Sequence, residues 1–180
     1  MATYAFEVAL VATAIGAYID GRTGVLPNWL VLPLIPAGLA LNFLAAGTSG
    51  LLGSAIGLVV CGLVPLILWL TSGGTAIGGG DVKLFAAIGA LLGTYSGLEV
   101  QLTAYVALLV IAFFMLAWRG QLSRTLANAF WMAVNWVLPK DKRRVVASEA
   151  LVAMRLGPAI FLATLVLYLL DSKAAHNLGF

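Results

Sequence analysis

At residues 77–84 the chain reads Ile77-Gly78-Gly79-Gly80-Asp81-Val82-Lys83-Leu84, a run of glycines that ends in one acidic residue at the start of an apolar segment. A carboxylate in such a segment costs roughly 2.5–3.5 kcal/mol on insertion scales, so Asp81 is a functional candidate by default. The glycines permit backbone angles and close approaches that a residue with a Cβ cannot make. Only one other acidic residue is similarly placed, Asp20 at the end of the first apolar segment.

The composition predicts an integral membrane protein. Of the 180 residues 62% are hydrophobic and 9% are charged, and the mean hydropathy is +1.05. A soluble domain is typically about 25% charged. We therefore expect an all-α, polytopic membrane protein with a single domain over residues 1–180. The net charge of +3 does not predict a nucleic-acid partner, because the charges flank apolar spans and form no extended basic face.

Six apolar stretches approach the length of about 20 residues that a helix needs to cross a bilayer. They cover residues 4–19, 29–46, 51–70, 82–95, 100–118 and 150–170. The first and fourth are short, which places Asp20 and Asp81 near or just inside the membrane boundary. Apolar residues at helical spacing over 121–138 predict an amphipathic helix on the cytoplasmic membrane surface. As a seventh span, that helix would carry Arg124, Asn128 and Asn135 into lipid.

The basic residues predict the orientation. With the N-terminus outside, nine of the ten Lys and Arg residues lie on the cytoplasmic side, and only Lys173 lies outside. Asp20 and Asp81 then share the cytoplasmic side. The first eight residues contain no Lys or Arg, so we expect no cleavable signal peptide.

Prolines and glycines predict where these spans begin, bend and pack closely. Pro27 predicts that the second span begins at about Asn28, and Pro65 predicts a kink in the third span. The pair Gly157-Pro158 predicts a gap in the hydrogen bonds of the last helix. Three glycines of the third span favour close helix packing: Gly53, Gly57 and Gly62.

Few side chains in the spans offer chemistry. The spans contain no histidine, and the lone Cys61 allows neither a disulfide framework nor a multi-cysteine zinc site within one chain. Asp20 and Asp81 remain. Two carboxylates a few ångströms apart share one proton and titrate as a unit. Such a pair can position a water, take its proton for attack on a peptide carbonyl and protonate the leaving nitrogen. Simpler interpretations stay open: either aspartate can end a span or cap a helix.

The same residues resemble a known family. The stretch from Gly78 to Leu84 is similar to the GxGD motif of the type IV prepilin peptidases. Asp20 followed by Leu26, Pro27 and Asn28 resembles their first motif, and Gly157-Pro158 resembles the Gly-Pro segment of their last span. The matches lie in order across the six spans and cover nearly the whole chain.

This resemblance implies a membrane aspartic endopeptidase with Asp20 and Asp81 as the catalytic pair and with no cofactor or metal. Its substrate would be a prepilin-like protein whose basic leader is cut on the cytoplasmic side of the inner membrane, just before a hydrophobic helix. The residues expected to support the pair are Gly78, Gly80, Lys83, Pro27, Asn28, Arg155, Gly157 and Pro158. We expect Arg155 either to pair with an acidic residue of the substrate or to extend to the interface.

Large members of the family carry a cytoplasmic insertion with zinc-binding cysteine pairs between the first two spans. Here that loop is about eight residues long and holds no cysteine. The chain therefore resembles the compact members, which are the Flp (tight-adherence) pilus peptidases and the archaeal preflagellin peptidases. We find no S-adenosylmethionine site and do not extend the N-methyltransferase activity of the large enzymes to this chain.

Three other functions compete with this interpretation. A small proton-coupled transporter also uses broken helices with half-buried acids. A protease of the presenilin type would need a partner span with a Tyr-Asp motif. No such span is present, and Tyr18-Ile19-Asp20 resembles that motif only loosely. A structural membrane subunit would need no chemistry at all.

Overall fold

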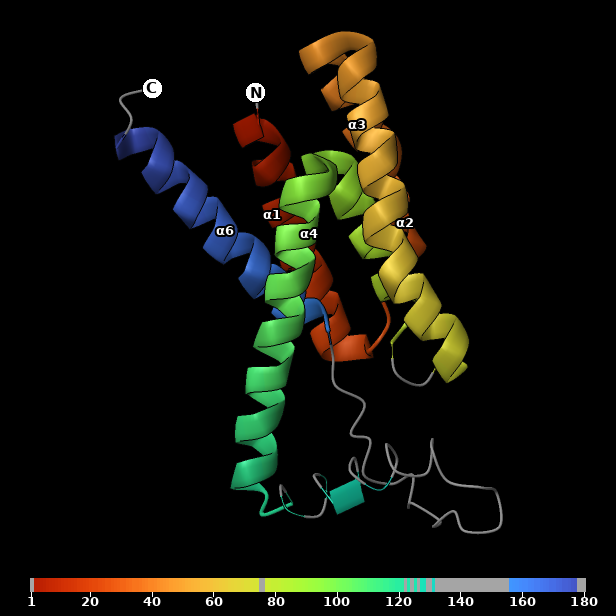
Figure 1. The fold of residues 1–180 in the computed structure, drawn as a ribbon, viewed down its shortest axis with the longest axis vertical. Helices are drawn as coiled ribbons and strands as arrows, with labels where there is room; N and C mark the ends of the chain where they lie inside the picture. Colours follow the sequence, from red (N-terminus) through yellow and green to blue (C-terminus); the bar gives the residue numbers. More distant parts are fainter. Residues whose placement is uncertain are drawn as a thin grey trace. The chain divides into compact units, whose positions relative to one another are not determined.

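A computed structural model describes residues 2–74, 77–121, 123, 125, 127, 128, 131 and 156–177. The regular elements in these residues are helices only, which confirms the all-α prediction. They are α1 (Ala2–Thr23), α2 (Asn28–Val31), α3 (Leu34–Ser72), α4 (Gly79–Trp118) and α6 (Gly157–Asn177) (Figure 1). The chain divides into two compact units, one made of Met1–Ala107 with Arg155–Phe180 and the other of Leu108–Met154. The packing described below belongs to the first unit.

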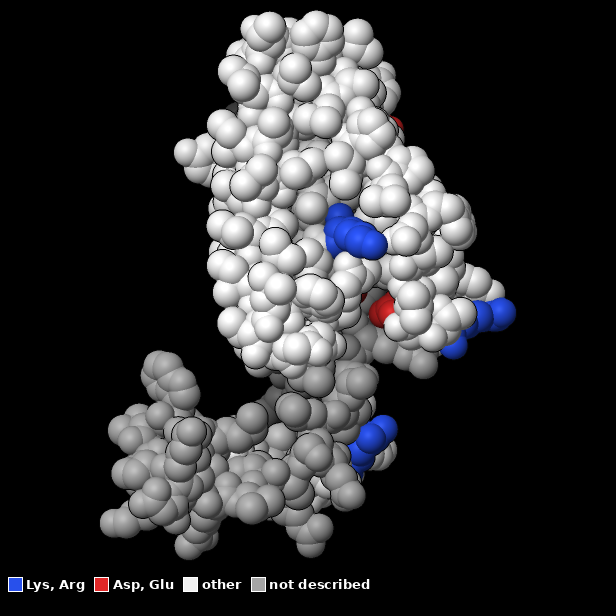
Figure 2. Space-filling model, turned by 90° about the vertical axis from the view of Figure 1, so that its right-hand side faces the viewer, with Lys and Arg blue, Asp and Glu red and all other residues white. Residues whose placement is uncertain are grey.

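Three helical stretches are long and apolar enough to cross a membrane: Tyr4–Thr23, Asn28–Ser72 and Gly79–Trp118. A shorter apolar helix covers Gly157–Ser172. Many large apolar side chains are exposed on these helices, and Figure 2 shows one face that is almost free of charged groups in its upper half. Such a surface suits lipid and agrees with a multi-pass membrane protein. The count of six spans stays a prediction.

Two of the long helices are hairpins. α3 loses helical backbone angles at Ala46 and Gly47, and α4 loses them at Gly93, whose φ is 76°. A Cβ on Gly97 would lie 3.0 Å from the Cα of Gly89, although eight residues of straight helix span about 12 Å. A Cβ on Gly50 would likewise collide with the backbone of Asn42. The chain therefore turns back within α3 and within α4 (Figure 1), close to where the predicted spans end at 46 and 95.

The helices continue past several of the predicted spans. α1 runs to Thr23, beyond the span predicted over 4–19, and residues 96–99, which lie between two predicted spans, are helical. The span predicted over 29–46 starts as the short α2 and restarts after Leu32 and Pro33 as α3. α4 begins at Gly79, so two glycines of the run lie in its first turn.

One of the two proline predictions needs correction. α6 begins at Gly157, so Gly157-Pro158 opens the helix and makes no gap inside it. A proline in the first turn loses no helical hydrogen bond, because the N–H groups there have no partner in any case. In α3 the non-helical angles lie at Ala46 and Gly47, and the kink at Pro65 stays a prediction.

Close contacts between small residues hold α3 against the first arm of α4. A Cβ on Gly57 would collide with the backbone of Gly89, and one on Gly62 would lie 3.0 Å from the Cβ of Ala86. Gly53 has no such neighbour within 4 Å, so close packing is confirmed for two of the three predicted glycines. The first arm of α4 also carries the fully buried side chains Leu84, Phe85, Ile88 and Leu91. α6 packs along α1.

Some predictions fall outside the described residues. They are Arg155 and most of the amphipathic helix predicted over 121–138.

Candidate active site

Asp81 is bound at the start of its own helix. The N–H of Gly78 donates to Asp81 Oδ2 at 3.2 Å, and the N–H of Asp81 donates to the carbonyl of Gly78 at 3.1 Å. Gly78 precedes the first helical residue, so Asp81 acts as the acidic half of a capping box. Its negative charge also suits the N-terminus of α4. The helix-capping interpretation of Asp81 therefore holds, and it leaves the carboxylate partly exposed beside the bundle.

Asp20 lies in the last turn of α1 and is buried, with 6% of its surface exposed. Its Oδ2 accepts a hydrogen bond of 3.1 Å from the N–H of Gly157, the first residue of α6. A Cβ on Gly157 would lie 2.8 Å from the same oxygen and 2.9 Å from the Cβ of Asp20. Only glycine fits at this position without moving the carboxylate.

The two acids are 61 residues apart in the sequence (81 minus 20), but their segments pack together. The Cβ of Leu26, in the loop after Asp20, would lie 2.8 Å from a Cβ on Gly80, the residue before Asp81. The last turn of α1 supplies one acid and the first turn of α4 supplies the other. Both acids therefore lie at one end of the bundle.

The loop after α1 packs against the glycine run. A Cβ on Gly80 would lie 2.8 Å from the Cβ of Leu26. Lys83 Nζ donates to Asn28 Oδ1 at 2.9 Å and so joins the start of α4 to the start of α2. Pro27 precedes α2 in an extended conformation. Of the predicted supporting residues, these contacts are made by Gly78, Gly80, Lys83, Asn28 and Gly157, and Pro27 and Pro158 adjoin residues that make them.

A polar pair that was not predicted from the sequence lies inside the bundle. Gln101 is 1% exposed, and its Nε2 donates to the carbonyl of Cys61 at 3.2 Å and to the Tyr105 hydroxyl at 3.1 Å. The signal was available, since two polar residues four positions apart share one face of an otherwise apolar helix.

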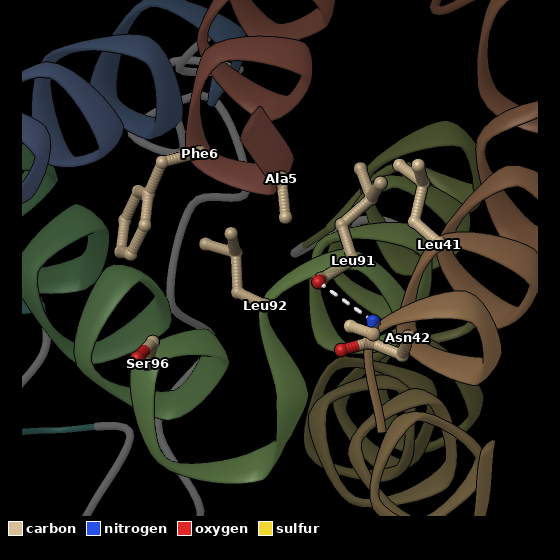
Figure 3. Close-up of a pocket in the computed structure, with 8 residues that line it drawn as sticks. Ala5, Phe6, Leu41, Asn42, Leu91, Leu92 and Ser96 are labelled. Carbon is tan, nitrogen blue, oxygen red and sulfur yellow. Dashed lines mark hydrogen bonds between the residues drawn. The ribbon is translucent and has the colours of Figure 1, made fainter. Parts of the chain in front are cut away.

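A cavity of about 160 Å³ lies elsewhere (Figure 3). It is lined by Ala5 and Phe6 of α1 and by residues of α3 and α4 that include Asn42 and Leu91. Figure 3 shows the Asn42 amide donating to the Leu91 carbonyl, at 3.0 Å. Phe6 precedes Asp20 by fourteen residues, or about 21 Å of helix. The cavity is therefore remote from the two acids.

No group of three or more His, Cys, Asp or Glu side chains in the described part of the chain is arranged to hold a metal ion. The acids that do meet are two, Asp20 and Asp81. What this site offers chemically is a pair of carboxylates, each accepting one backbone N–H, with a lysine and a phenol nearby.

Comparison with known proteins shows what this chain is similar to. Residues 8–120 match the type IV leader peptidase family. A prepilin leader peptidase/N-methyltransferase of Burkholderia pseudomallei strain K96243 is 40% identical over 123 residues, which are 66% of this chain and 38% of that protein. Proteins of the same name from Neisseria gonorrhoeae and Dickeya chrysanthemi are 33% and 38% identical, over 70% and 66% of this chain and 50% and 44% of their own lengths. The chain thus spans half or less of these relatives. No solved structure matches it.

Proposed function

Because this chain belongs to the type IV leader peptidase family, we propose that it is a membrane aspartic endopeptidase that removes the leader peptide of prepilin-like proteins. Asp20 and Asp81 form its catalytic pair, at the cytoplasmic face of the inner membrane. A compact peptidase for Flp-type pilins is the form that we favour, and a preflagellin peptidase would use the same chemistry.

One observation carries this proposal. Two acids from distant parts of an apolar chain lie at one end of the helical bundle, where the loop after Asp20 packs against the glycine before Asp81. Ionisable groups in membrane-spanning segments are costly and are typically functional. Helix capping accounts for Asp81 alone, but it does not explain why a second, buried carboxylate lies beside it.

The pair supports hydrolysis in the following way. One carboxylate takes a proton from a water molecule, whose oxygen attacks the carbonyl carbon of the scissile peptide bond. The other acid, which holds the shared proton, protonates the nitrogen as the C–N bond breaks. The products are a carboxylic acid and an amine, and the proton taken from water restores the shared proton of the pair. The N–H groups of Gly78 and Gly157 keep the two carboxylates in place throughout.

The substrate class follows from the position of the pair. A prepilin-like protein has a basic leader in the cytoplasm and a hydrophobic helix in the lipid, so its scissile bond lies at the membrane interface. The acids lie in the last turn of α1 and the first turn of α4, and we expect them at a comparable depth. The apolar outer surface lets the substrate helix approach laterally through the bilayer.

The test uses the purified chain in detergent with a prepilin-like protein, and mass spectrometry to follow loss of the leader. We expect the wild-type chain to cut the substrate. Asp20→Asn and Asp81→Asn should each reduce cleavage by at least about a thousandfold while circular dichroism stays unchanged. Full activity in either variant would remove that aspartate from the mechanism. Proton-coupled transport without cleavage would support the transporter instead.

A further inference from the structure

The Gln101–Tyr105 pair is not explained by packing. Gln101 Oε1 is buried and has no hydrogen-bond partner among the described residues. Leaving a buried acceptor without a partner is unfavourable, and a group of this kind in a native protein calls for a specific explanation. The same side chain makes its two donor bonds to the Cys61 carbonyl and to the Tyr105 hydroxyl. Its effect is to hold the Tyr105 hydroxyl in one place.

The hairpin in α4 sets the level of Tyr105. Gly89 and Gly97 touch across the turn at Gly93. The two arms run antiparallel from this turn, so residues at equal distances from it lie at the same level. About four residues make one helical turn, which puts Phe85 level with Gln101 and Asp81 level with Tyr105. Tyr105 therefore starts at the level of Asp81, on the neighbouring arm.

The Tyr105 side chain points from that level toward the middle of the bundle. Helical side chains lean toward the N-terminus of their own helix, which for the second arm of α4 is the direction of Gly93. The contact with Phe85 agrees, since the two rings lie 5.4 Å apart at 58°. The hydroxyl is thus about one helical turn deeper than Asp81.

The Tyr105 hydroxyl has a hydrogen-bond donor to spare. It accepts from Gln101, and no acceptor for its own O–H is found in the described part of the chain. Tyr105 is half-buried, whereas Gln101 is fully enclosed. An incoming chain can therefore reach the phenol, and the amide behind it serves to orient it.

A substrate cut by this chain needs such a donor. Its peptide bonds next to the scissile bond must leave the helical conformation to reach the two acids. Backbone groups freed in this way have no water to bind in the apolar interior, and each unsatisfied group costs several kcal/mol. A phenol O–H is a suitable partner for a peptide carbonyl.

We propose that Tyr105 is a substrate-binding residue whose hydroxyl, oriented by Gln101, donates to a backbone carbonyl of the substrate on the hydrophobic side of the scissile bond. One helical turn is about 5.4 Å, and an extended chain rises about 3.3 Å per residue. The bound carbonyl is therefore about two residues beyond the scissile bond. This inference rests on the proposed peptidase function.

The test compares Tyr105→Phe with Tyr95→Phe. Both variants lose only a hydroxyl from the same helix. Tyr95, however, is 88% exposed and lies two residues after the turn at Gly93. Steady-state cleavage is measured on a synthetic peptide with a basic leader, a glycine and a hydrophobic helix. We expect Tyr105→Phe to lower kcat/KM about tenfold, the loss typical of one hydrogen bond. Tyr95→Phe should match the wild type, and both should keep the wild-type melting temperature.

Ester analogues of the peptide separate a substrate contact from a structural role. Each of the first three peptide bonds beyond the scissile bond is replaced in turn by an ester, whose carbonyl is a weaker acceptor. The wild type should cleave one of these analogues several-fold more slowly than the amide, and Tyr105→Phe should not discriminate at that position. Equal discrimination by both enzymes, or kcat/KM within twofold of wild type for Tyr105→Phe, overturns the proposal.

A second variant, Gln101→Leu, covers the case in which Tyr105→Phe folds poorly. It should lose the same discrimination at the same peptide bond, because the phenol is no longer held, and unchanged discrimination in Gln101→Leu counts against the proposal. Failure of the wild-type chain to cut the amide peptide at all is a different result, since it removes the proposed function itself.

Discussion

Asp20 depends on a residue 137 positions later in the chain. The N–H of Gly157 donates to its carboxylate, and the absence of a Cβ on Gly157 leaves room for that carboxylate. The sequence suggested that Gly157 and Pro158 would break a helix, but they begin one. The start of α6 thereby becomes part of the candidate site, because its first N–H groups have no helical partner and are free to bind an anion.

The first prediction concerns this contact. Gly157→Ala should lower kcat/KM for leader cleavage roughly 10- to 100-fold, since displacing a catalytic group by about 1 Å has effects of that size. The matched control is Gly53→Ala, where a new Cβ meets nothing within 4 Å, and its activity should equal that of the wild type. Cleavage by Gly157→Ala at the wild-type rate would show that Asp20 does not depend on this backbone contact.

At the scale of elements, the bond between Lys83 and Asn28 joins α4 to α2. Leu26 and Gly80 touch beside it. α2 follows the loop after α1, the helix that carries Asp20. Asp81 lies in the first turn of α4. The bond therefore helps to set the separation of the two acids, although both of its side chains are exposed.

The second prediction tests this attachment with a double-mutant cycle. Lys83→Met and Asn28→Leu should each reduce kcat/KM about two- to fivefold, as expected for an exposed polar contact. The double variant should be no worse than the single ones, because residues that act through one shared bond are not additive. Arg119→Met removes an exposed cation at the other end of α4 and serves as the control. Fully additive losses would indicate that the two residues act separately.

On the scale of the whole molecule, the first unit is held together by close packing of small residues. Cys61 is fully buried at the point where α3 meets both arms of α4. A Cβ on Gly97 would lie 2.8 Å from its Sγ, and one on Gly89 would lie 2.8 Å from its Cβ. In lipid, helices associate through such close contacts, since burial of apolar surface gives little driving force there.

The third prediction uses Cys61, the single cysteine of the chain, as a reporter of this packing. A maleimide should not label the folded protein in mild detergent and should label it completely after denaturation in dodecyl sulfate. Gly57→Leu should be labelled in mild detergent, because its side chain would collide with the backbone of Gly89 and separate the helices. A Thr48→Cys variant in a Cys61→Ser background provides an exposed control. Rapid labelling of folded wild-type protein would contradict the packing.

Much of this protein follows from the sequence alone. Composition and apolar runs determined a helical membrane protein, because a chain in lipid must satisfy its backbone hydrogen bonds internally. The cost of charge in apolar segments drew attention to Asp20 and Asp81. The residues expected around them could be listed in advance because they match the motifs of a known family.

The tertiary structure decided the rest. Hairpin turns at Gly47 and Gly93, the start of α6 at Gly157 and the pairing of Gln101 with Tyr105 all depend on contacts between residues far apart in the chain. Hydropathy measures how well a segment dissolves in lipid, and it does not register which helix lies beside which. Only packing at van der Waals distance, where one Cβ more or less changes the fit, brings two distant acids to one place.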